Sequence, residues 1–99
     1  MEILKTDAKK AVTFKLTGNL DVRSSPDLEE HLVEAFAETK YVTLDFKDVA
    51  YISSSGLRVI LSGDQTAKGK GGRLTITNAS AFIMQIFEVT GFTSILHFE

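Results

Sequence analysis

Three adjacent serines, Ser53, Ser54 and Ser55, stand where an apolar strand pattern at 41–46 gives way to a helical pattern opening at Leu57. Serine is favoured at helix starts because its oxygen accepts hydrogen bonds from the unpaired backbone N–H groups of the first turn. Those N–H groups, together with the helix dipole, also stabilise an anion. The position therefore suits either a simple helix cap or a phosphate group.

Other residues capable of chemistry do not form a recognisable catalytic or metal-binding pattern. The glycines at 69–72 follow a helical pattern, and they lack the G-x-x-x-x-G-K-[ST] spacing of a phosphate-binding loop. Ser54 lies outside a G-x-S-x-G elbow, and the two histidines, His31 and His97, offer it no convincing base. The acidic residues are scattered along helix faces, and the chain has no cysteine. We therefore expect no enzyme activity, no metal and no cofactor.

Composition indicates one domain over residues 1–99, since 99 residues with 43% hydrophobic content can bury one modest core. The net charge of −2 comes from 13 acidic and 11 basic residues spread along the sequence. This spread shows no electrostatic footprint for nucleic acid or an anionic membrane, so neither is an expected partner. The absence of cysteine favours an intracellular protein. No apolar run resembles a signal peptide or a membrane span, and we expect a cytoplasmic location.

Apolar residues alternate with polar ones in three segments, which predicts half-buried strands at 11–17, 41–46 and 74–76. A helix is predicted from Ser25, with Pro26 at its first helical position. The expected inward residues of that helix are Leu28, Leu32, Ala35 and Phe36. Further helices are expected from the serines and from Ser80 to a left-handed cap at Gly91, and a last strand is expected at 94–98.

Alternating strands and helices predict an α/β fold with parallel strands joined by right-handed crossovers. A short polar turn after residues 3–5 predicts an antiparallel first strand, so the sheet is expected to be mixed but mostly parallel, with about five strands. Helices should lie mainly on one face. The opposite face should meet solvent through polar residues: Thr13, Lys15, Thr43, Asp45, Arg73, Thr75 and Thr77.

Four spaced motifs in this order resemble the signature of STAS domains, specifically the small bacterial anti-sigma factor antagonists. The motifs are Gly18-Asn19-Leu20-Asp21, Leu44-Asp45-Phe46, Ser54-Ser55-Gly56-Leu57 and Ile86-Phe87-Glu88-Val89-Thr90-Gly91-Phe92. The resemblance covers essentially the whole chain. It implies a single STAS-like domain that works by binding other proteins.

The resemblance also implies a phosphorylation switch. A serine kinase that doubles as an anti-sigma factor would bind the domain, phosphorylate Ser54 and release it, and a serine phosphatase would reset it. The resemblance places partner contacts in the loop and at the helix start: Asp21, Ser53, Ser55, Gly56, Leu57 and Arg58. Asp21 could equally be an ordinary turn residue, and Arg58 a solvated helix residue.

One position departs from the family pattern, because Ser53 stands where the family commonly has an aspartate before the phosphorylated serine. This leaves Ser53 and Ser55 open as acceptors. It also leaves open a scaffold or accessory subunit of a signalling or transport complex that is never phosphorylated. Phe82 and Met84 lie off the apolar stripe of the third helix, which allows a homo-oligomer or simply a wide core-facing stripe.

Overall fold

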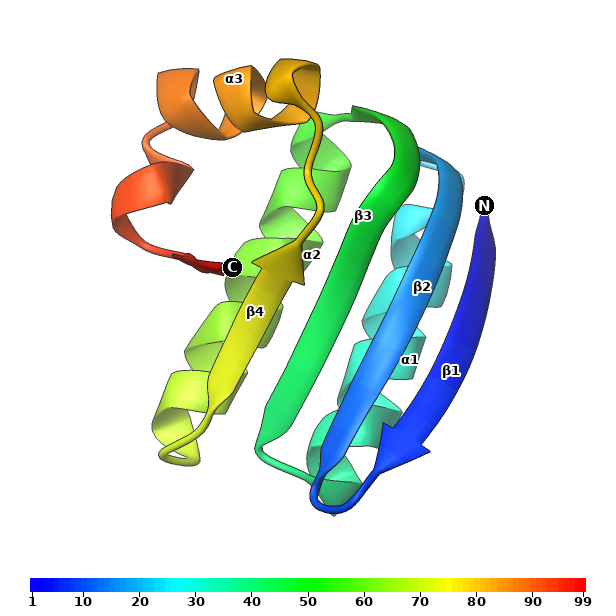
Figure 1. Ribbon diagram of the computed structural model, residues 1–99, viewed down its shortest axis with the longest axis vertical. Helices are drawn as coiled ribbons and strands as arrows, with labels where there is room; N and C mark the ends of the chain where they lie inside the picture. Colours follow the sequence, from blue (N-terminus) through cyan, green and yellow to red (C-terminus); the bar gives the residue numbers. More distant parts are fainter.

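The computed structural model describes residues 1–99 as one sheet with helices packed on it (Figure 1). The elements are β1 (Glu2–Ala8), β2 (Ala11–Leu20), α1 (Ser25–Glu38), β3 (Tyr41–Ile52), α2 (Ser54–Gly69), β4 (Arg73–Thr77), α3 (Ala81–Val89), the 3₁₀ turn η1 (Phe92–Ser94) and β5 (His97–Phe98). The five strands lie in the order β1-β2-β3-β4-β5. β1 is antiparallel to β2, and every other pair is parallel. The predicted mixed, mostly parallel sheet is confirmed.

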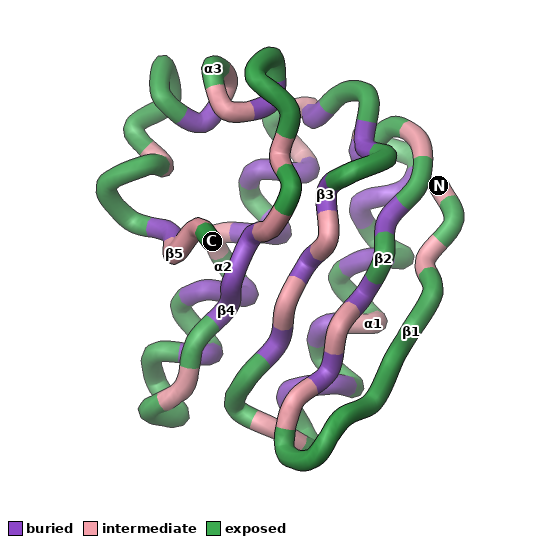
Figure 2. The backbone as a smooth tube through the Cα atoms, in the orientation of Figure 1, coloured by how far each residue is buried: buried purple, intermediate pink, exposed green.

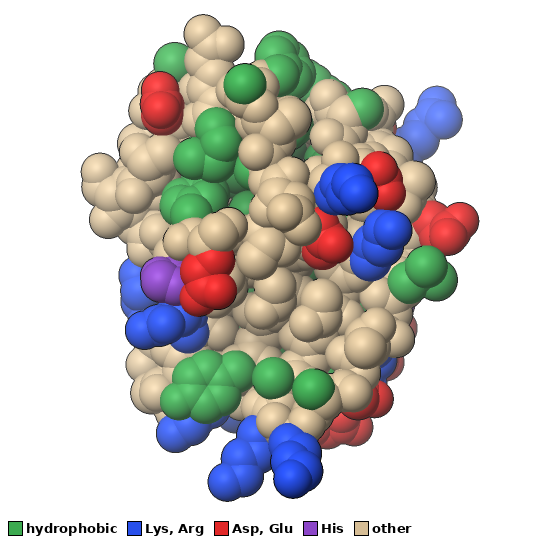
Figure 3. All heavy atoms as spheres, in the orientation of Figure 1, with side chains coloured by type: hydrophobic (Ala, Val, Ile, Leu, Met, Phe, Trp, Pro, Cys, Tyr) green, Lys and Arg blue, Asp and Glu red, His purple; other side chains and the backbone are tan.

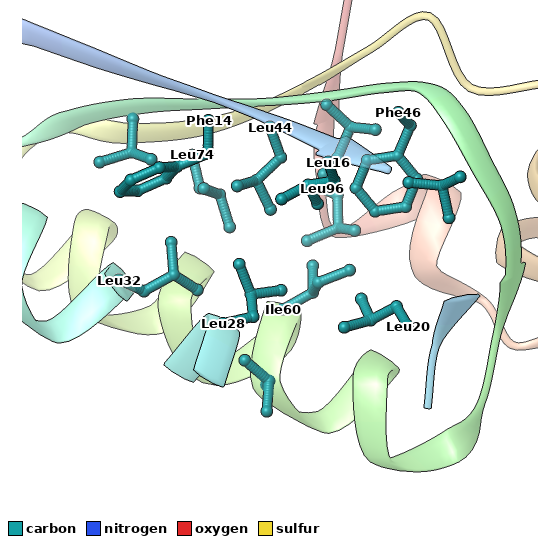
Figure 4. Close-up of a cluster of buried hydrophobic side chains, with 14 of the residues drawn as sticks. Phe14, Leu16, Leu20, Leu28, Leu32, Leu44, Phe46, Ile60, Leu74 and Leu96 are labelled. Atoms are coloured by element: carbon teal, nitrogen blue, oxygen red, sulfur yellow. The ribbon is translucent and has the colours of Figure 1, made fainter. Parts of the chain in front are cut away.

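The core lies between the sheet and the two long helices. β2 buries every second residue through Val12, Phe14 and Leu16, and β3 does the same from Val42 to Phe46. The predicted inward residues of α1 are all buried (Figure 2). Figure 4 shows these side chains meeting in one apolar layer with residues of α2 and β4. Burial of each such side chain contributes roughly 1.5–3 kcal/mol, so this layer dominates the stability of the fold.

Helices α1 and α2 cover one face of the sheet, whereas α3 lies across its carboxyl end (Figure 1). This confirms that the helices lie mainly on one face. On the other face the predicted polar residues are exposed or half-buried, with one exception. Thr75 is buried, and its register partners are Thr43 of β3 and His97 of β5. No helix is both long and apolar enough to cross a membrane.

Three predicted strand boundaries are wrong. β2 and β3 continue beyond residues 17 and 46 to Leu20 and Ile52, because the ladder between them extends that far through two register shifts. The last strand contains only 97–98, since η1 occupies residues 92–94 after the left-handed Gly91 (φ 80°). α1 begins at Ser25 as predicted, with Pro26 as its second rather than its first helical residue.

Candidate functional site

Parallel pairing of β2 and β3 brings two helix starts together at the carboxyl edge of the sheet. Leu20 and Ile52 are register partners at the ends of these strands. The backbone N–H of Ser53 donates to the carbonyl of Leu20 at 2.8 Å. Asp21 follows Leu20 directly, so the loop after β2 lies beside the start of α2.

The three serines at the start of α2 have different environments. Ser53 is the N-cap in extended conformation (φ −95°, ψ 174°), and its Oγ accepts from the Gly56 N–H at 3.4 Å. Ser54, the first helical residue, is exposed, and Ser55 is half-buried. Neither hydroxyl makes a hydrogen bond within the chain. Ser53 therefore caps the helix, and Ser54 presents a free hydroxyl beside the unpaired N–H groups of the first turn.

Gly56 and Leu57 are buried beneath the serines. A Cβ atom at Gly56 would lie 2.6 Å from Leu20 Cγ and 3.0 Å from Ile52 Cγ1, so only glycine lets α2 begin directly on the sheet. Both residues thus support the site from below, and their predicted contact with a partner stays a prediction. Arg58 is exposed and forms no ion pair.

Asp21 organises the loop between β2 and α1. Its Oδ1 accepts from the backbone N–H groups of Arg23 (3.0 Å) and Ser24 (3.3 Å). Its own N–H donates to Ser24 Oγ at 2.9 Å. The hydrogen bond from Arg23, followed by those from Ser24, holds the pKa of Asp21 below its ordinary value of 3.8 despite some desolvation. Asp21 is therefore ionised and fixed in place next to the capped start of α2.

Ser24 is a site residue that the sequence analysis missed. Its hydroxyl donates to the carbonyl of Asn19 at 2.8 Å while accepting from Asp21, so it holds the loop closed. The signal was present as an Asp-x-x-Ser spacing just before a helix, a pattern of reciprocal hydrogen bonding at helix starts. A polar hollow of about 460 Å³ lies against this loop. Its lining consists of Met1, Asn19, Asp21, Arg23, Ser24 and Asp27.

The fold and the site together define a small α/β domain with one exposed, unbonded serine hydroxyl at a helix N-terminus, beside a loop held by the hydrogen bonds of Asp21. The chain belongs to the STAS family, since the family model described as "Mlab, STAS domain" matches residues 4–97.

Relatives of this chain are anti-sigma factor antagonists. The anti-sigma-B factor antagonist of Bacillus subtilis (strain 168) is 32% identical over 85 residues, which cover 86% of this chain and 78% of that protein. The structure of the anti-sigma factor antagonist SpoIIAA in its unphosphorylated form has a TM-score of 0.81 at 16% identity, covering 99% of this chain and 87% of that one. The phosphorylated form of Bacillus SpoIIAA has a TM-score of 0.79 at 17% identity, covering 99% and 91%. At these identities the two structures bear on the fold alone.

Proposed function

We propose that this chain is a cytoplasmic anti-sigma factor antagonist, switched by phosphorylation of Ser54. In its unphosphorylated form it binds an anti-sigma factor that is also a serine kinase. Phosphorylation by that kinase weakens the contact, and a serine phosphatase restores it. The proposal is supported by family membership, by relatives named anti-sigma-B factor antagonist and by the environment of Ser54.

The observation that carries the proposal is that the three serines differ in exposure and in hydrogen bonding. Ser53 is occupied as the cap, and Ser55 is half-buried, whereas Ser54 alone is exposed with an unbonded hydroxyl. A kinase can phosphorylate only a hydroxyl that reaches its active site, so the acceptor must be accessible. The family aspartate is also accounted for, because aspartate and serine cap helices equally well. Ser53 therefore keeps the cap while removing one negative charge beside the acceptor.

A phosphate on Ser54 changes the surface without disturbing the fold. It adds about 1.5–2 negative charges and three acceptor oxygens at a helix N-terminus, where both are tolerated. Arg58 lies four positions further on the same exposed helix and can pair with it. Asp21, which stays ionised on the adjoining loop, adds a second negative charge. The resulting acidic surface is unfavourable for a partner that binds the neutral serine. Each 1.4 kcal/mol of lost binding free energy weakens binding about tenfold.

Intact mass and phosphosite mapping of the chain from its own growing and stressed cells tests this proposal directly. We expect one phosphate, on Ser54, whose occupancy changes with condition. Ser54→Ala should lose the phosphate, while Ser55→Ala, a matched removal of the neighbouring hydroxyl, should retain it. Phosphate on Ser53 or Ser55 would contradict Ser54 as the acceptor. No phosphate under any condition would contradict control by phosphorylation.

Partner binding supplies the second half of the test. Proteins captured from the same cells by the wild-type chain should include a serine kinase, and Ser54→Asp should weaken that capture by at least tenfold. Ser54→Ala should bind the kinase and stay bound when ATP is added. Equal behaviour of the two variants would contradict phosphorylation as the release step.

A second candidate is an accessory subunit that binds constitutively, which the serine at position 53 favours because the acidic neighbour of the acceptor is missing. It predicts no phosphate on any serine and equal partner binding by Ser54→Asp and Ser54→Ala. Self-association stays a separate prediction. The structure shows Phe82 54% exposed, while Met84 packs partly against the core. A monomeric solution mass for both wild type and Phe82→Glu would contradict a homo-oligomer through this surface.

A further inference from the structure

A groove between α1 and α2 lies on the helical side of the domain, and its walls come from residues away from Ser54. Its volume is about 250 Å³. The lining consists of Glu29, Leu32, Val33, Phe36, Ala37, Val59, Ser62, Gly63, Thr66 and Lys70. From Val59 to Thr66 the α2 wall runs seven positions, or about 10 Å at the rise of an α-helix. The groove is therefore a narrow apolar trough rather than a broad interface.

Two residues, Gly63 and Val33, give the groove its shape. Gly63 forms the floor, because a Cβ atom there would lie 3.1 Å from Leu32 Cδ1. Val33 stands on the wall of α1 and is 67% exposed, although Glu29, Glu30 and Glu34 lie within about one turn of it. An exposed branched side chain facing an apolar trough loses contact with water when the trough is filled, and this favours an apolar occupant.

One end of the groove opens onto a cluster of positive charge. A shallower hollow continues it from Phe36 and Ala37 to Lys40 and Lys70. Glu38 also lines this hollow, and its carboxylate pairs with Lys5 at 3.7 Å. Neither Lys40 nor Lys70 forms an ion pair. The two loops that carry them are joined, since the Arg73 N–H donates to the Lys40 carbonyl at 2.8 Å. The mouth of the groove thus holds two lysines without ion pairs, on connected backbone, beside one carboxylate whose charge is offset by Lys5.

These lysines belong to a wider basic end that the linear sequence concealed. Tight turns at the amino edge of the sheet bring together basic residues from three distant segments: Lys9, Lys10, Lys40, Lys70 and Arg73. None of the five forms an ion pair. Figure 3 shows Lys and Arg side chains gathered at this lower end of the molecule. Glu29 lies at the other end of the groove, so charge changes sign along its length.

We propose that the α1–α2 groove binds a monomeric anionic amphiphile with one acyl chain, of the fatty-acid type. The chain lies in the trough over Gly63, and the head group lies between Lys40 and Lys70. Charge complementarity fixes the orientation, because the lysines attract the anion at one end and Glu29 repels it at the other. The length and volume of the trough suit a single chain of medium length. This inference does not depend on the proposed phosphorylation switch.

Titration of the ¹⁵N-labelled full chain with sodium decanoate, kept below its micelle concentration, tests the proposal. We expect saturable amide shifts centred on Gly63 and Thr66. Lys70→Glu should weaken binding about fivefold, and Val33→Asp about tenfold, since it places a charge on the apolar wall. Both positions are exposed, so both variants should fold. Lys9→Glu makes the same charge change at the same end of the molecule but outside the groove, and it should alter binding less than twofold.

Three further probes separate the groove from a generic basic surface. Decanol, which has the chain without the charge, should bind more weakly than decanoate. Inorganic phosphate should leave the Gly63 and Thr66 amides unshifted, and phosphatidylglycerol vesicles should not cosediment the chain. Equal weakening by Lys9→Glu and Lys70→Glu, or binding to vesicles but not to decanoate, would contradict the groove as the binding site. Either result would indicate that the basic end binds an anionic membrane surface instead. An absence of saturable shifts with decanoate would overturn the proposal outright.

Discussion

Two helices begin with serines at the same edge of the sheet, and the two groups of serines are used in opposite ways. At the start of α1, Ser24 and Ser25 are only 8% and 4% exposed. Both hydroxyls donate to backbone carbonyls, that of Ser24 to Asn19 near the end of β2 and that of Ser25 to Asp21 in the loop. At the start of α2, only Ser53 is engaged, and Ser54 is exposed without a partner. Residue type and position in the helix are similar, whereas accessibility differs completely.

This difference bears on the proposal that Ser54 is phosphorylated and Ser24 and Ser25 are not. Ser24 and Ser25 stabilise a loop, so any added group there must break existing hydrogen bonds. A group added to Ser54 would break no hydrogen bond, because its neighbour Ser53 already caps the helix. The hydroxyl of Ser54 can stay without a hydrogen bond because Ser53 already caps α2.

Placing an aspartate at each helix start should give the largest effect. Ser25→Asp buries a carboxylate that cannot donate to the Asp21 carbonyl, and we expect a loss of about 3 kcal/mol in the free energy of unfolding. Ser54→Asp adds an exposed charge near a helix N-terminus, and we expect a change within about 0.5 kcal/mol or a small gain. Urea denaturation followed by circular dichroism measures both. Equal losses in the free energy of unfolding would show that the serines at the starts of α1 and α2 do not differ as described.

Glycine substitutions in α2 should give the next largest effect. Gly56→Ala forces a methyl group against Leu20 and Ile52, and we expect a loss of about 1–2 kcal/mol even after the better helix propensity of alanine. Gly69→Ala is the matched control, because a Cβ atom there meets nothing within 4 Å. It should gain up to about 1 kcal/mol in the same measurement. A stabilised Gly56→Ala would show that α2 can lift from the sheet at low cost.

Hydrophobic periodicity was enough to predict the element order and the core, because both depend on which residues face inward. It failed where the pattern itself breaks. Lys15 and Thr17 of β2 face Asp45 and Asp48, so β3 contains an extra residue there, and Lys47 and Asp48 are both exposed. A bulge of this kind interrupts the two-residue period, and the strand was expected to end early.

The resemblance to STAS domains predicted a site at the three serines, but it did not distinguish their environments. Which of three neighbouring hydroxyls caps a helix depends on the backbone angles of one residue, and residue type does not report them. Gly56 and Leu57 share the motif but are buried beneath the serines, and their predicted contact with a partner stays a prediction. Ser24 was overlooked because its function is to hold Asp21, a contact made within a loop.

Changing the cap should have a smaller effect on stability. Ser53→Ala removes the oxygen that accepts from Gly56, and we expect a loss of about 1 kcal/mol. Ser53→Asp restores an acceptor and the family residue, so its stability should equal or slightly exceed that of the wild type. A loss of this size lowers the melting temperature of a domain of this length by about 4–8 °C. Equal melting of Ser53→Ala and wild type would mean that Ser53 is not the effective cap.

The smallest expected effect concerns Asp21 and appears only in acid. Its pKa is held below 3.8 in the folded chain by the hydrogen bonds from Arg23 and Ser24. A lowered folded pKa means that the stabilisation is complete above the unfolded pKa and is lost as pH falls through the folded value. Asp21→Asn keeps a side-chain acceptor but cannot titrate. The stability difference between wild type and variant should therefore be constant above about pH 5 and shift against the wild type as pH falls below 4.

Urea midpoints of both proteins from pH 2 to pH 6 measure this difference. Asp45 also has a lowered pKa, because hydrogen bonds from Asn78 and Lys47 outweigh its partial desolvation. That carboxylate is present in both proteins, so its contribution cancels in the difference. A difference that does not change with pH would mean that the Asp21 hydrogen bonds are equally strong in its protonated form. The loop beside Ser54 would then be held by Ser24 and the backbone rather than by charge.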